Sequence, residues 1–269
     1  MSRPSGSRAR RRRTPLPLLV LGCLGIVLFI LPFLGLLSRT PWGRLPALLA
    51  GDVVTDALRL SFLTSIAATA ISLLLGVPLA WLLARVEFPG RAVLRGVVTL
   101  PLVLPPVVGG AALLFALGRR GLLGGALESA TGLLLPFSVW GVIIANTFVA
   151  MPFLVITVEG ALRAMDSRYE DAASTLGAGP WTTVRRVALP MIGPSLKAGL
   201  VLTWARAFGE FGATITFAGN LQSRTQTLPL AVFVALESDR DTAVAISLVM
   251  VAVSLLVLLT LRERWWRVP

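Results

Sequence analysis

The chain has 269 residues, 55% of them hydrophobic, with a mean hydropathy of +0.82 and a net charge of +12. Only 14% of its residues are charged, whereas soluble domains carry about a quarter, so the composition favours a membrane protein over a soluble one with a large core. The basic character does not indicate nucleic-acid binding, because six arginines lie in residues 1–13, directly before an apolar run. That arrangement is typical of a cytoplasmic tail.

Missing residue types exclude several chemistries. The chain contains no histidine, a single cysteine (Cys23) and a single lysine (Lys197). An intrachain disulfide, a His/Cys zinc site and a Ser-His-Asp triad are therefore excluded. Lys197 precedes alanine, so it cannot belong to a P-loop, which needs Gly-Lys-Ser/Thr. We expect no enzyme or ATPase, no catalytic or metal-binding residue and no cofactor in this chain.

Charged residues divide the chain into six apolar segments, each long enough for a helix of about 20 residues that crosses the hydrocarbon core. The segments are residues 14–38, 60–84, 96–118, 129–158, 193–218 and 242–261, and only the one at 193–218 is interrupted by charges. Long continuous apolar runs predict helices rather than strands. The expected fold is an all-α membrane bundle of six transmembrane helices.

The charges of the loops predict the orientation. The two tails and residues 85–95 and 159–192 are basic, whereas acids offset the arginines in the three remaining loops. Because basic loops stay in the cytoplasm, both termini are predicted to be cytoplasmic. The first apolar run is predicted to be an uncleaved anchor rather than a signal peptide, because it is long and no small-x-small cleavage site follows it.

These features divide the chain into four parts. We expect a basic tail (1–14), a first transmembrane helix with its outer loop (15–50), a core of five transmembrane helices (52–262) and a C-terminal tail (263–269).

The core contains one long polar segment, EDAASTLGAGPWTTVRRVALP, residues 170–190. Ser167 and Glu170 have the spacing of a capping box, which is a helix-start signal. Gly177 stands where a left-handed residue ends such a helix, and Gly179-Pro180 starts another. The pattern predicts two short cytoplasmic helices whose apolar faces pack on the bundle or on another protein. A simple connector on the membrane surface is the alternative.

The segment resembles the EAA loop of ABC-importer permeases of the MetI-like family (binding-protein-dependent transport inner membrane components). In that family Glu-Ala-Ala is followed by three residues, Gly, nine residues and Ile-x-Leu-Pro. Here Asp171-Ala172-Ala173 leads with the same spacings to Gly177 and to Val187-Ala188-Leu189-Pro190, with Asp171 and Val187 replacing Glu and Ile. The resemblance implies that residues 166–190, hereafter the EAA segment, dock as a coupling loop in a separate ATPase, with Glu170 assisting Asp171.

Two charges interrupt the fifth apolar segment in ARAFGEFGATITFAGN, residues 205–220. Arg206 and Glu210 are four residues apart, so on one helix they share a face and can pair. Charges inside a membrane face the bundle interior or a water-filled path. The pair therefore either staples helices together or lines a translocation pathway, for which the neighbouring Phe211, Gly212 and Thr214 are further candidates.

The third apolar segment contains LPLVLPPVVGG, residues 100–110. Pro105 and Pro106 prevent a straight helix, and Gly109-Gly110 is expected to add flexibility. Broken helices at membrane depth lie against protein or a cavity, so these residues are also pathway candidates, with a lipid-facing kink as the alternative. Arg119-Arg120 at the outer end would attract an anion or anchor the interface.

Four stretches extend the resemblance to molybdate-type permeases within the oxyanion importers: LPLVLPPVVGG, GEFGAT, FAGN and RTQTLPLAV (residues 224–232). The resemblance covers residues 52–262. It implies a homodimeric permease in the lipid of the bacterial inner membrane. Two ABC ATPase subunits carrying ATP-Mg and an extracytoplasmic binding protein would be its partners, and molybdate or tungstate its substrate.

Three alternatives remain at this stage. Sulfate and thiosulfate permeases share the Gly-Glu-Phe-Gly element with this sequence. An ion-coupled secondary transporter would instead use Glu210 as a titrating group and need no ATPase. An intramembrane enzyme is disfavoured, because the spans contain no histidine and no cluster of paired acids.

Overall fold

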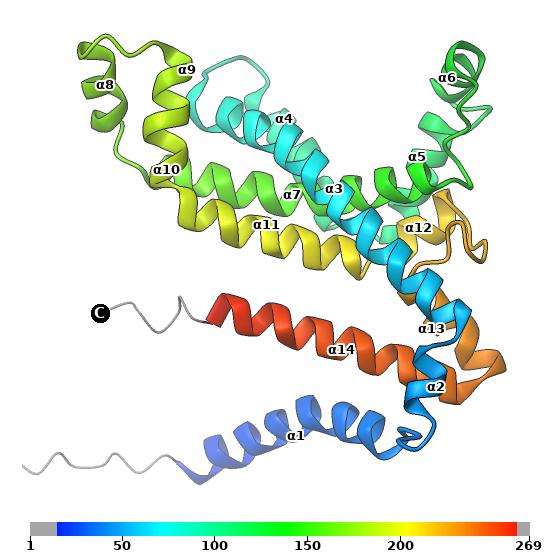
Figure 1. The fold of residues 1–269 in the computed structure, drawn as a ribbon. Helices are drawn as coiled ribbons and strands as arrows, with labels where there is room; N and C mark the ends of the chain where they lie inside the picture. Colours follow the sequence, from blue (N-terminus) through cyan, green and yellow to red (C-terminus); the bar gives the residue numbers. More distant parts are fainter. Residues whose placement is uncertain (1–14, 263–269) are drawn as a thin grey trace, which may run out of the picture.

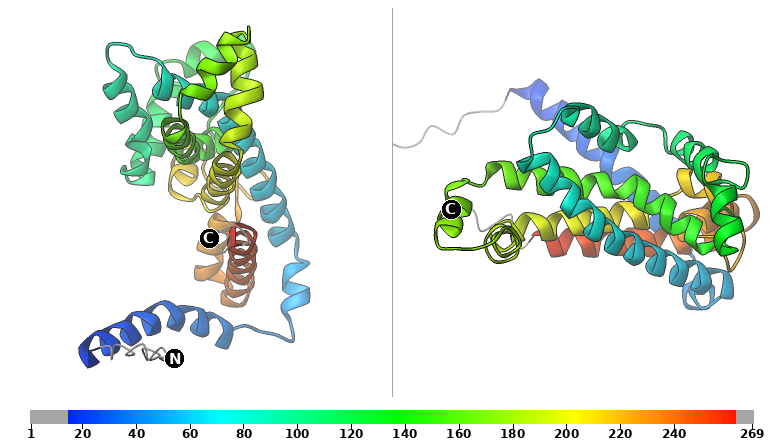
Figure 2. Two further views of the ribbon diagram at one scale, coloured as in Figure 1. Left: turned by 90° about the vertical axis from the view of Figure 1, so that its left-hand side faces the viewer. Right: turned by 90° about the horizontal axis from the view of Figure 1, so that it is seen from above.

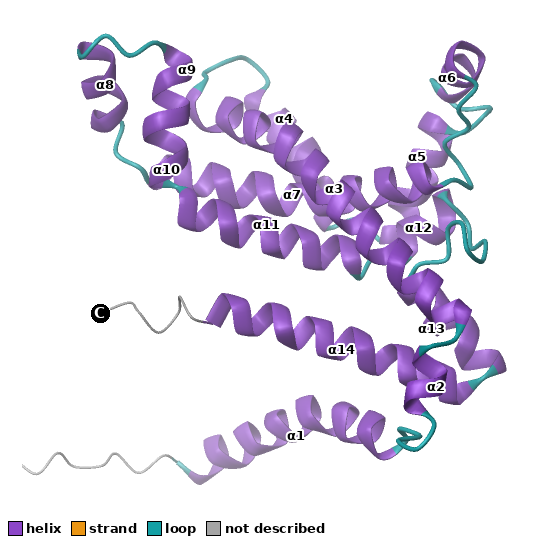
Figure 3. Cartoon of the chain, viewed as in Figure 1, coloured by secondary structure: helices purple, strands orange, loops and turns teal. Residues whose placement is uncertain are grey.

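The computed structural model describes residues 15–262, and this part of the chain folds into helices and loops with no strand (Figures 1 and 3). Within it, four helices are long and apolar enough to cross a membrane, and two bent helix pairs bring the number of spans to six if each pair counts as one. The four are α1 (Leu16–Ser38), α3 (Asp52–Arg85), α7 (Val139–Ala164) and α14 (Arg240–Arg262). The prediction of an all-α membrane bundle is confirmed.

The first bent pair occupies the proline-rich third segment. Helix α4 (Arg91–Thr99) continues through a 3-10 turn, η1 (Leu100–Leu102), and meets α5 (Pro106–Leu117) at an angle of 117°. Pro106 disfavours the helical conformation for the residue before it, and Pro105 is accordingly extended, with ψ of 130°. The predicted break is confirmed, and it is a sharp corner rather than a kink.

The second bent pair joins the EAA segment to the bundle. The helical stretch Pro180–Met191 meets α11 (Gly193–Phe208) at 76°, and the break lies at Ile192. Residues 193–218 were predicted to form one membrane-crossing helix, but the structure divides them. Helix α11 ends at Phe208, and a short helix, α12 (Gly212–Phe217), follows. Two glycines close together, at 209 and 212, weaken the helix where it ends.

Two predicted spans have different ends in the structure. Helix α3 begins eight residues before the predicted span, with Asp52 in its first turn, where an acid suits the helix dipole. Helix α7 begins at Val139, where Ser138 accepts a hydrogen bond from the Gly141 N–H, and it continues to Ala164. The loop predicted from residue 159 therefore begins only at residue 165.

Three helices lie where loops were expected. They are α2 (Leu45–Leu49), α6 (Gly124–Thr131) and α13 (Leu228–Ser238). Helix α13 packs inside the bundle, since Leu228 is fully buried in a cluster with Ala57 of α3, Phe208 of α11 and Ile246 of α14. The proline in its first turn and the apolar run from residue 228 were the sequence signals for this helix.

The core forms where α3, α7 and α11 lie side by side (Figures 1 and 2). Helix α1 stands apart: it has no buried residue, and only its second half approaches α14, across an apolar hollow lined by side chains such as Phe33 and Val251.

The connections segregate to opposite ends of the bundle. In Figure 1 the start of α1, the end of α14, the α3–α4 link and the EAA segment lie at the left, whereas α2 and α6 lie at the right. This arrangement agrees with the predicted division into basic and mixed loops. The tails, residues 1–14 and 263–269, lie outside the described residues.

Candidate functional site

The EAA segment folds as two short helical pieces joined by a glycine turn, as predicted. Helix α8 (Arg168–Thr175) is followed by Gly177, which has a φ of +83°, and by α9 (Pro180–Thr183), a π-helical turn η2 (Val184–Ala188) and α10 (Leu189–Met191). A φ of this sign favours glycine over every other residue. The turn therefore depends on the residue type at position 177.

The start of α8 differs from the prediction. Ser167 has helical dihedral angles (φ −62°, ψ −19°) and its side chain makes no capping hydrogen bond, whereas a capping residue is normally extended. Asp166 takes the role instead, since its carboxylate accepts a hydrogen bond from the Arg168 N–H at 3.0 Å and pairs with the Arg168 side chain. The side-chain and backbone hydrogen bonds from Arg168 hold the pKa of Asp166 below its ordinary value.

The two adjacent acids of the EAA segment serve different surfaces. Glu170 Oε1 lies 2.9 Å from Arg85 Nη2 and 3.0 Å from Arg85 Nε at the end of α3, and both side chains are largely buried. Asp171 is exposed and forms no ion pair with any residue in 15–262. Glu170 therefore ties α8 to the bundle and leaves Asp171 free.

The tip of the EAA segment presents apolar side chains to the outside. Leu176 is 89% exposed, Trp181 72% and Tyr169 55%. Ala172 is also exposed and Ala173 is half-buried. Helix α8 thus packs little of its apolar face on its own chain, which leaves that face for a partner.

The second half of the segment is anchored instead. Ala188 is fully buried in the core cluster with Leu83 and Leu154, while Val187 and Leu189 are half-buried and Pro190 is exposed. Pro190 cannot donate the N–H that a regular helix requires, and the π-helical turn directly before it is a usual response to such a defect. The helical stretch ends two residues after Pro190, at Ile192.

The predicted intramembrane ion pair is present. Arg206 Nη1 lies 2.5 Å from Glu210 Oε2, and Glu210 is 1% exposed. Glu210 lies beyond the end of α11, and its Oε1 accepts a hydrogen bond from the Ala213 N–H at 2.8 Å. Its Oε2 contacts Arg206 without an aligned hydrogen bond. The carboxylate therefore links α11 to α12 as well as neutralising Arg206.

Two glycines bring α5 and α12 into backbone contact. A Cβ on Gly110 would lie 2.7 Å from the Ala213 carbonyl oxygen, and one on Gly212 would lie 2.7 Å from Pro106 Cβ. Gly109 faces the Phe148 ring, with 3.2 Å for a Cβ. The Gly109-Gly110 pair thus serves close packing rather than the predicted flexibility. Pro105 and Pro106 are exposed.

A buried polar chain that the sequence prediction missed crosses the bundle. The Thr214 hydroxyl donates to Asn146 Oδ1 at 3.3 Å, and Asn146 Nδ2 donates to Thr64 Oγ1 at 3.4 Å. An asparagine inside an apolar run was its only sequence signal. Phe211, in contrast, turns toward α13, where its ring lies 5.4 Å from that of Phe233. The residues predicted to line the translocation pathway therefore form a packed junction between helices rather than one open channel.

Two features at the end of the bundle opposite the EAA segment do not favour anion binding. A hollow of about 560 Å³ between α2, α3 and α13 is lined by Asp52 and Asp239 and by none of the pathway candidates. Arg119 binds Glu128 through two hydrogen bonds, and this bonding holds the pKa of Glu128 below its ordinary value. The positive charge of Arg119 is therefore already paired with a carboxylate of the same chain.

A helical bundle with broken helices in its apolar part, a buried ion pair and a helical segment with an apolar tip defines a multi-pass membrane transport subunit. The chain belongs to the family of binding-protein-dependent transport system inner membrane components, whose sequence profile matches residues 76–265. It is a multi-pass inner-membrane permease subunit of an ABC transporter, as the EAA resemblance implied.

Curated relatives cover most of the chain. The molybdenum transport system permease protein ModB of Mycobacterium bovis is 48% identical over 80% of this chain and 81% of its own. The protein of the same name from Escherichia coli K12 is 42% identical over 70% of this chain and 82% of its own. A probable sulfate transport system permease protein cysT of Marchantia polymorpha is 36% identical over 81% of this chain and 78% of its own.

Solved structures share the fold. A bacterial ABC transporter involved in alginate import matches with a TM-score of 0.70 and 18% identity over 94% of each chain. A bacterial alginate transporter in complex with a pentasaccharide-bound periplasmic protein matches with a TM-score of 0.68 and 20% identity over 91% of this chain and 93% of its own.

Proposed function

We propose that this chain is the permease of an ATP-driven molybdate importer and that Asp171 and the α8 tip dock into a separate ABC ATPase. The observation that supports the ATPase contact is that the EAA segment binds its own chain through one acid and exposes the other. Glu170 pairs with Arg85, while Asp171, Leu176 and Trp181 are exposed. A rigid short helix with an unpartnered acid and apolar tip is suited to a protein cleft, and it transmits a push that a flexible loop would dissipate.

The energy must come from that partner, because this chain has no P-loop lysine. ATP-Mg is assigned to the ATPase subunits, whose closure would move α8 and bias the bundle between inward-open and outward-open states. Coupling of this kind is reciprocal, so the conformation of the bundle also biases nucleotide binding.

A homodimer would complete the pathway. A single chain places the pathway candidates in a packed junction of α5 and α12. Helix α1 has no buried residue, and only its second half approaches α14. In the membrane, lipid or a second copy would cover α1. The positive-inside rule, applied to the basic loops and tails of the sequence, supports a cytoplasmic EAA segment and cytoplasmic termini, so a binding protein would deliver the anion at the opposite end.

Molybdate is favoured over sulfate because the molybdenum permeases named above have 42% and 48% identity to this chain, against 36% for the sulfate permease. Tungstate is a second oxyanion for the same route. An ion-coupled secondary transporter is disfavoured, because membership of this family implies an ATPase partner rather than a titrating Glu210.

The test is reconstitution of the chain in proteoliposomes with its ABC ATPase and its binding protein. We expect binding protein loaded with molybdate to stimulate ATP hydrolysis several-fold and the same protein offered sulfate to stimulate it little. Equal stimulation by both anions would support the sulfate assignment. Anion uptake that needs no ATPase would support the secondary transporter.

A further inference from the structure

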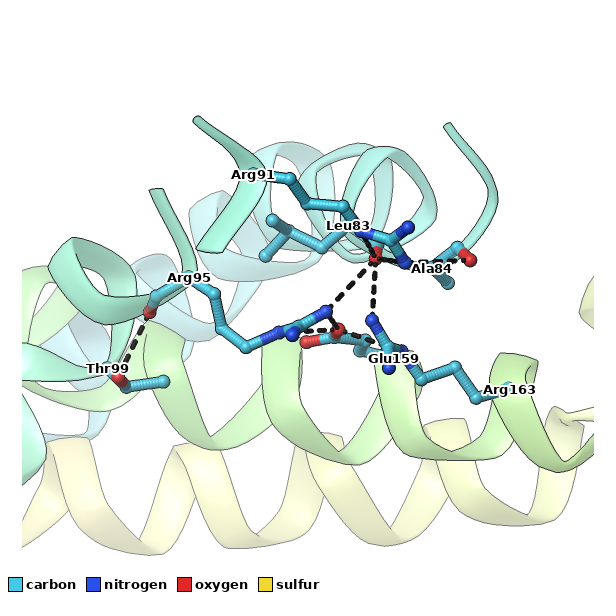
Figure 4. Close-up of polar contacts among 7 residues, drawn as sticks. All are labelled: Leu83, Ala84, Arg91, Arg95, Thr99, Glu159 and Arg163. Atoms are coloured by element: carbon cyan, nitrogen blue, oxygen red, sulfur yellow. Dashed lines mark hydrogen bonds and ion pairs between the residues drawn. The ribbon is translucent and has the colours of Figure 1, made fainter. Parts of the chain in front are cut away.

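Three arginines converge on the carbonyl groups that end α3, beside the EAA segment but outside it (Figure 4). The last carbonyls of a helix have no partner within the helix and carry partial negative charge. The Leu83 carbonyl oxygen accepts hydrogen bonds from Arg91 Nε at 2.8 Å, Arg163 Nη2 at 3.2 Å and Arg95 Nη2 at 3.4 Å. Arg91 also donates to the Ala84 carbonyl.

Glu159 of α7 joins two of these arginines. Its Oε1 lies 2.5 Å from Arg95 Nη2 and 3.0 Å from Arg163 Nε, and Glu159 is 6% exposed. Figure 4 shows Arg95 and Arg163 reaching Glu159 from opposite sides, with the Leu83 carbonyl above it. One buried carboxylate therefore fixes arginines of α4 and α7 against the end of α3.

The cluster is continuous with the EAA segment. Arg85, two residues after Leu83, holds Glu170 of α8. Leu83 is also packed in the core cluster that contains Ala188, at the anchored end of the segment. A displacement of α8 thus reaches the end of α3 through both a salt bridge and side-chain packing.

The cluster also connects to the broken third span. Arg91 and Arg95 are four residues apart, on one face of α4, so this face is attached to α3 and α7 at two points. Beyond α4 lies the corner of 117° and then α5, whose Gly110 touches α12. Helix α4 is therefore connected through this corner to the α5–α12 junction.

We infer that Glu159 is a positioning residue: by clamping Arg95 and Arg163 onto the end of α3, it carries movement of the EAA segment into α4 and on to the α5–α12 junction. The inference rests on the proposed function and deepens it, because it names the route from the ATPase-facing helix to the pathway. Without the clamp, α8 would still bind and respond to the ATPase, but α4 would follow it poorly.

The experiment compares Glu159→Gln with the wild-type chain in the reconstituted complex with ATPase and molybdate-loaded binding protein. We expect ATP hydrolysis to stay within twofold of wild type and the molybdate taken up per ATP hydrolysed to fall at least tenfold. Glu87→Gln, in the exposed α3–α4 link, removes a carboxylate that forms no ion pair within residues 15–262 and is expected to keep the wild-type ratio.

A distance measurement tests the clamp without transport. Spin labels at Val93→Cys on α4 and Ser174→Cys on α8, both exposed positions, would be placed in a Cys23→Ser chain diluted with unlabelled copies. We expect one narrow distance distribution for the intact clamp and a broad one for Glu159→Gln. Arg163→Lys, which retains the charge but lacks the fork that reaches both Glu159 and Leu83, should lie between them.

The outcomes separate the two proposals. An unchanged uptake-to-ATP ratio with an unchanged distance distribution in Glu159→Gln would overturn the clamp. A proportional loss of uptake and hydrolysis, in Glu159→Gln and in Arg163→Lys alike, would reduce it to a folding role. If the wild-type complex took up no anion with ATP, the proposed function would fail, whereas the distance comparison would still decide on the clamp.

Discussion

Glu170 of α8 and Arg85 at the end of α3 are joined by an ion pair of 2.9 Å in which both side chains are largely buried. The neighbouring Asp171, which aligns with the glutamate of the EAA pattern, is exposed. Glu170 therefore binds within the permease, while Asp171 is left for the expected ATPase partner.

This division predicts opposite phenotypes for two adjacent substitutions. Glu170→Gln should lower the free energy of unfolding by about 2 kcal/mol, because it weakens charged hydrogen bonds in a largely buried place. Asp171→Asn should leave stability unchanged within about 0.5 kcal/mol but reduce ATPase binding at least tenfold. Thermal unfolding in detergent and co-purification with the ATPase measure the two effects. The reverse pattern would show that the acids had been assigned to the wrong surfaces.

The turn at Gly177 predicts a second effect. Its φ of +83° costs an alanine about 1–2 kcal/mol, although no atom lies within 4 Å of the added Cβ. Proline cannot adopt this φ at all, so Gly177→Pro should abolish ATP-coupled uptake while the chain still inserts in the membrane. Gly179→Ala is the control, since Gly179 has a φ of −69° and equally open surroundings. Normal uptake by Gly177→Pro would disprove the coupling role of the turn.

The contact between α5 and α12 predicts a third effect. Gly110→Ala and Gly212→Ala would each place a Cβ 2.7 Å from a neighbouring atom, so each should destabilise the protein by about 1–3 kcal/mol. Gly96→Ala in α4 has open space around it and should be neutral or stabilising. Melting temperatures of the purified variants give the comparison. Equal stability of all three variants would mean that α5 and α12 are not in contact.

The Arg206–Glu210 pair predicts a fourth effect. Arg206→Met should cost about 3–5 kcal/mol, because it leaves a buried carboxylate without its cation. Glu210→Gln keeps an acceptor for the Ala213 N–H and should cost less, yet it should lower molybdate uptake per folded transporter at least fivefold if the pair lies on the pathway. Wild-type uptake by folded Glu210→Gln would leave the pair with only a structural role.

A pH effect is predicted at Asp239, the residue before α14. Asp239 caps α14 by accepting hydrogen bonds from the hydroxyl and N–H of Thr242, and these bonds lower its pKa. Because the pKa is lower in the folded state, the stabilisation is complete above the unfolded value of about 3.9 and is lost as the pH falls through the folded value. Melting temperatures measured from pH 6 to 3 should fall more for wild type than for Asp239→Asn. Parallel curves would contradict this cap.

The spans were predictable because a membrane helix needs only a long apolar stretch, which residues 16–38 or 242–261 show without reference to any neighbour. The ends of the membrane-crossing helices were harder to predict. Glu159 marked the predicted end of a span, but α7 runs on to Ala164, since Arg95, distant in sequence, neutralises the buried carboxylate. Arg163, four residues after Glu159, also pairs with it and was a local signal, whereas the contact with Arg95 comes from another helix and leaves no local pattern.

The same distinction applies to the site. Gly177, Pro180 and the Leu189-Pro190 ending act through local backbone geometry, so their spacing predicted the two helices and the turn. The capping box did not form: Asp166 accepts the hydrogen bond from the Arg168 N–H, and Glu170 pairs with Arg85. Asn146 and the arginines around Leu83 were missed because their roles depend on contacts between helices.

The proposed function is tested most directly by molybdate uptake into proteoliposomes that contain this chain, its ABC ATPase and a molybdate-loaded binding protein. We expect uptake that requires ATP and is lost, with the ATPase no longer bound, in Asp171→Asn. Uptake of the same rate without ATP, or full ATP-dependent uptake by Asp171→Asn with the ATPase still bound, would contradict it.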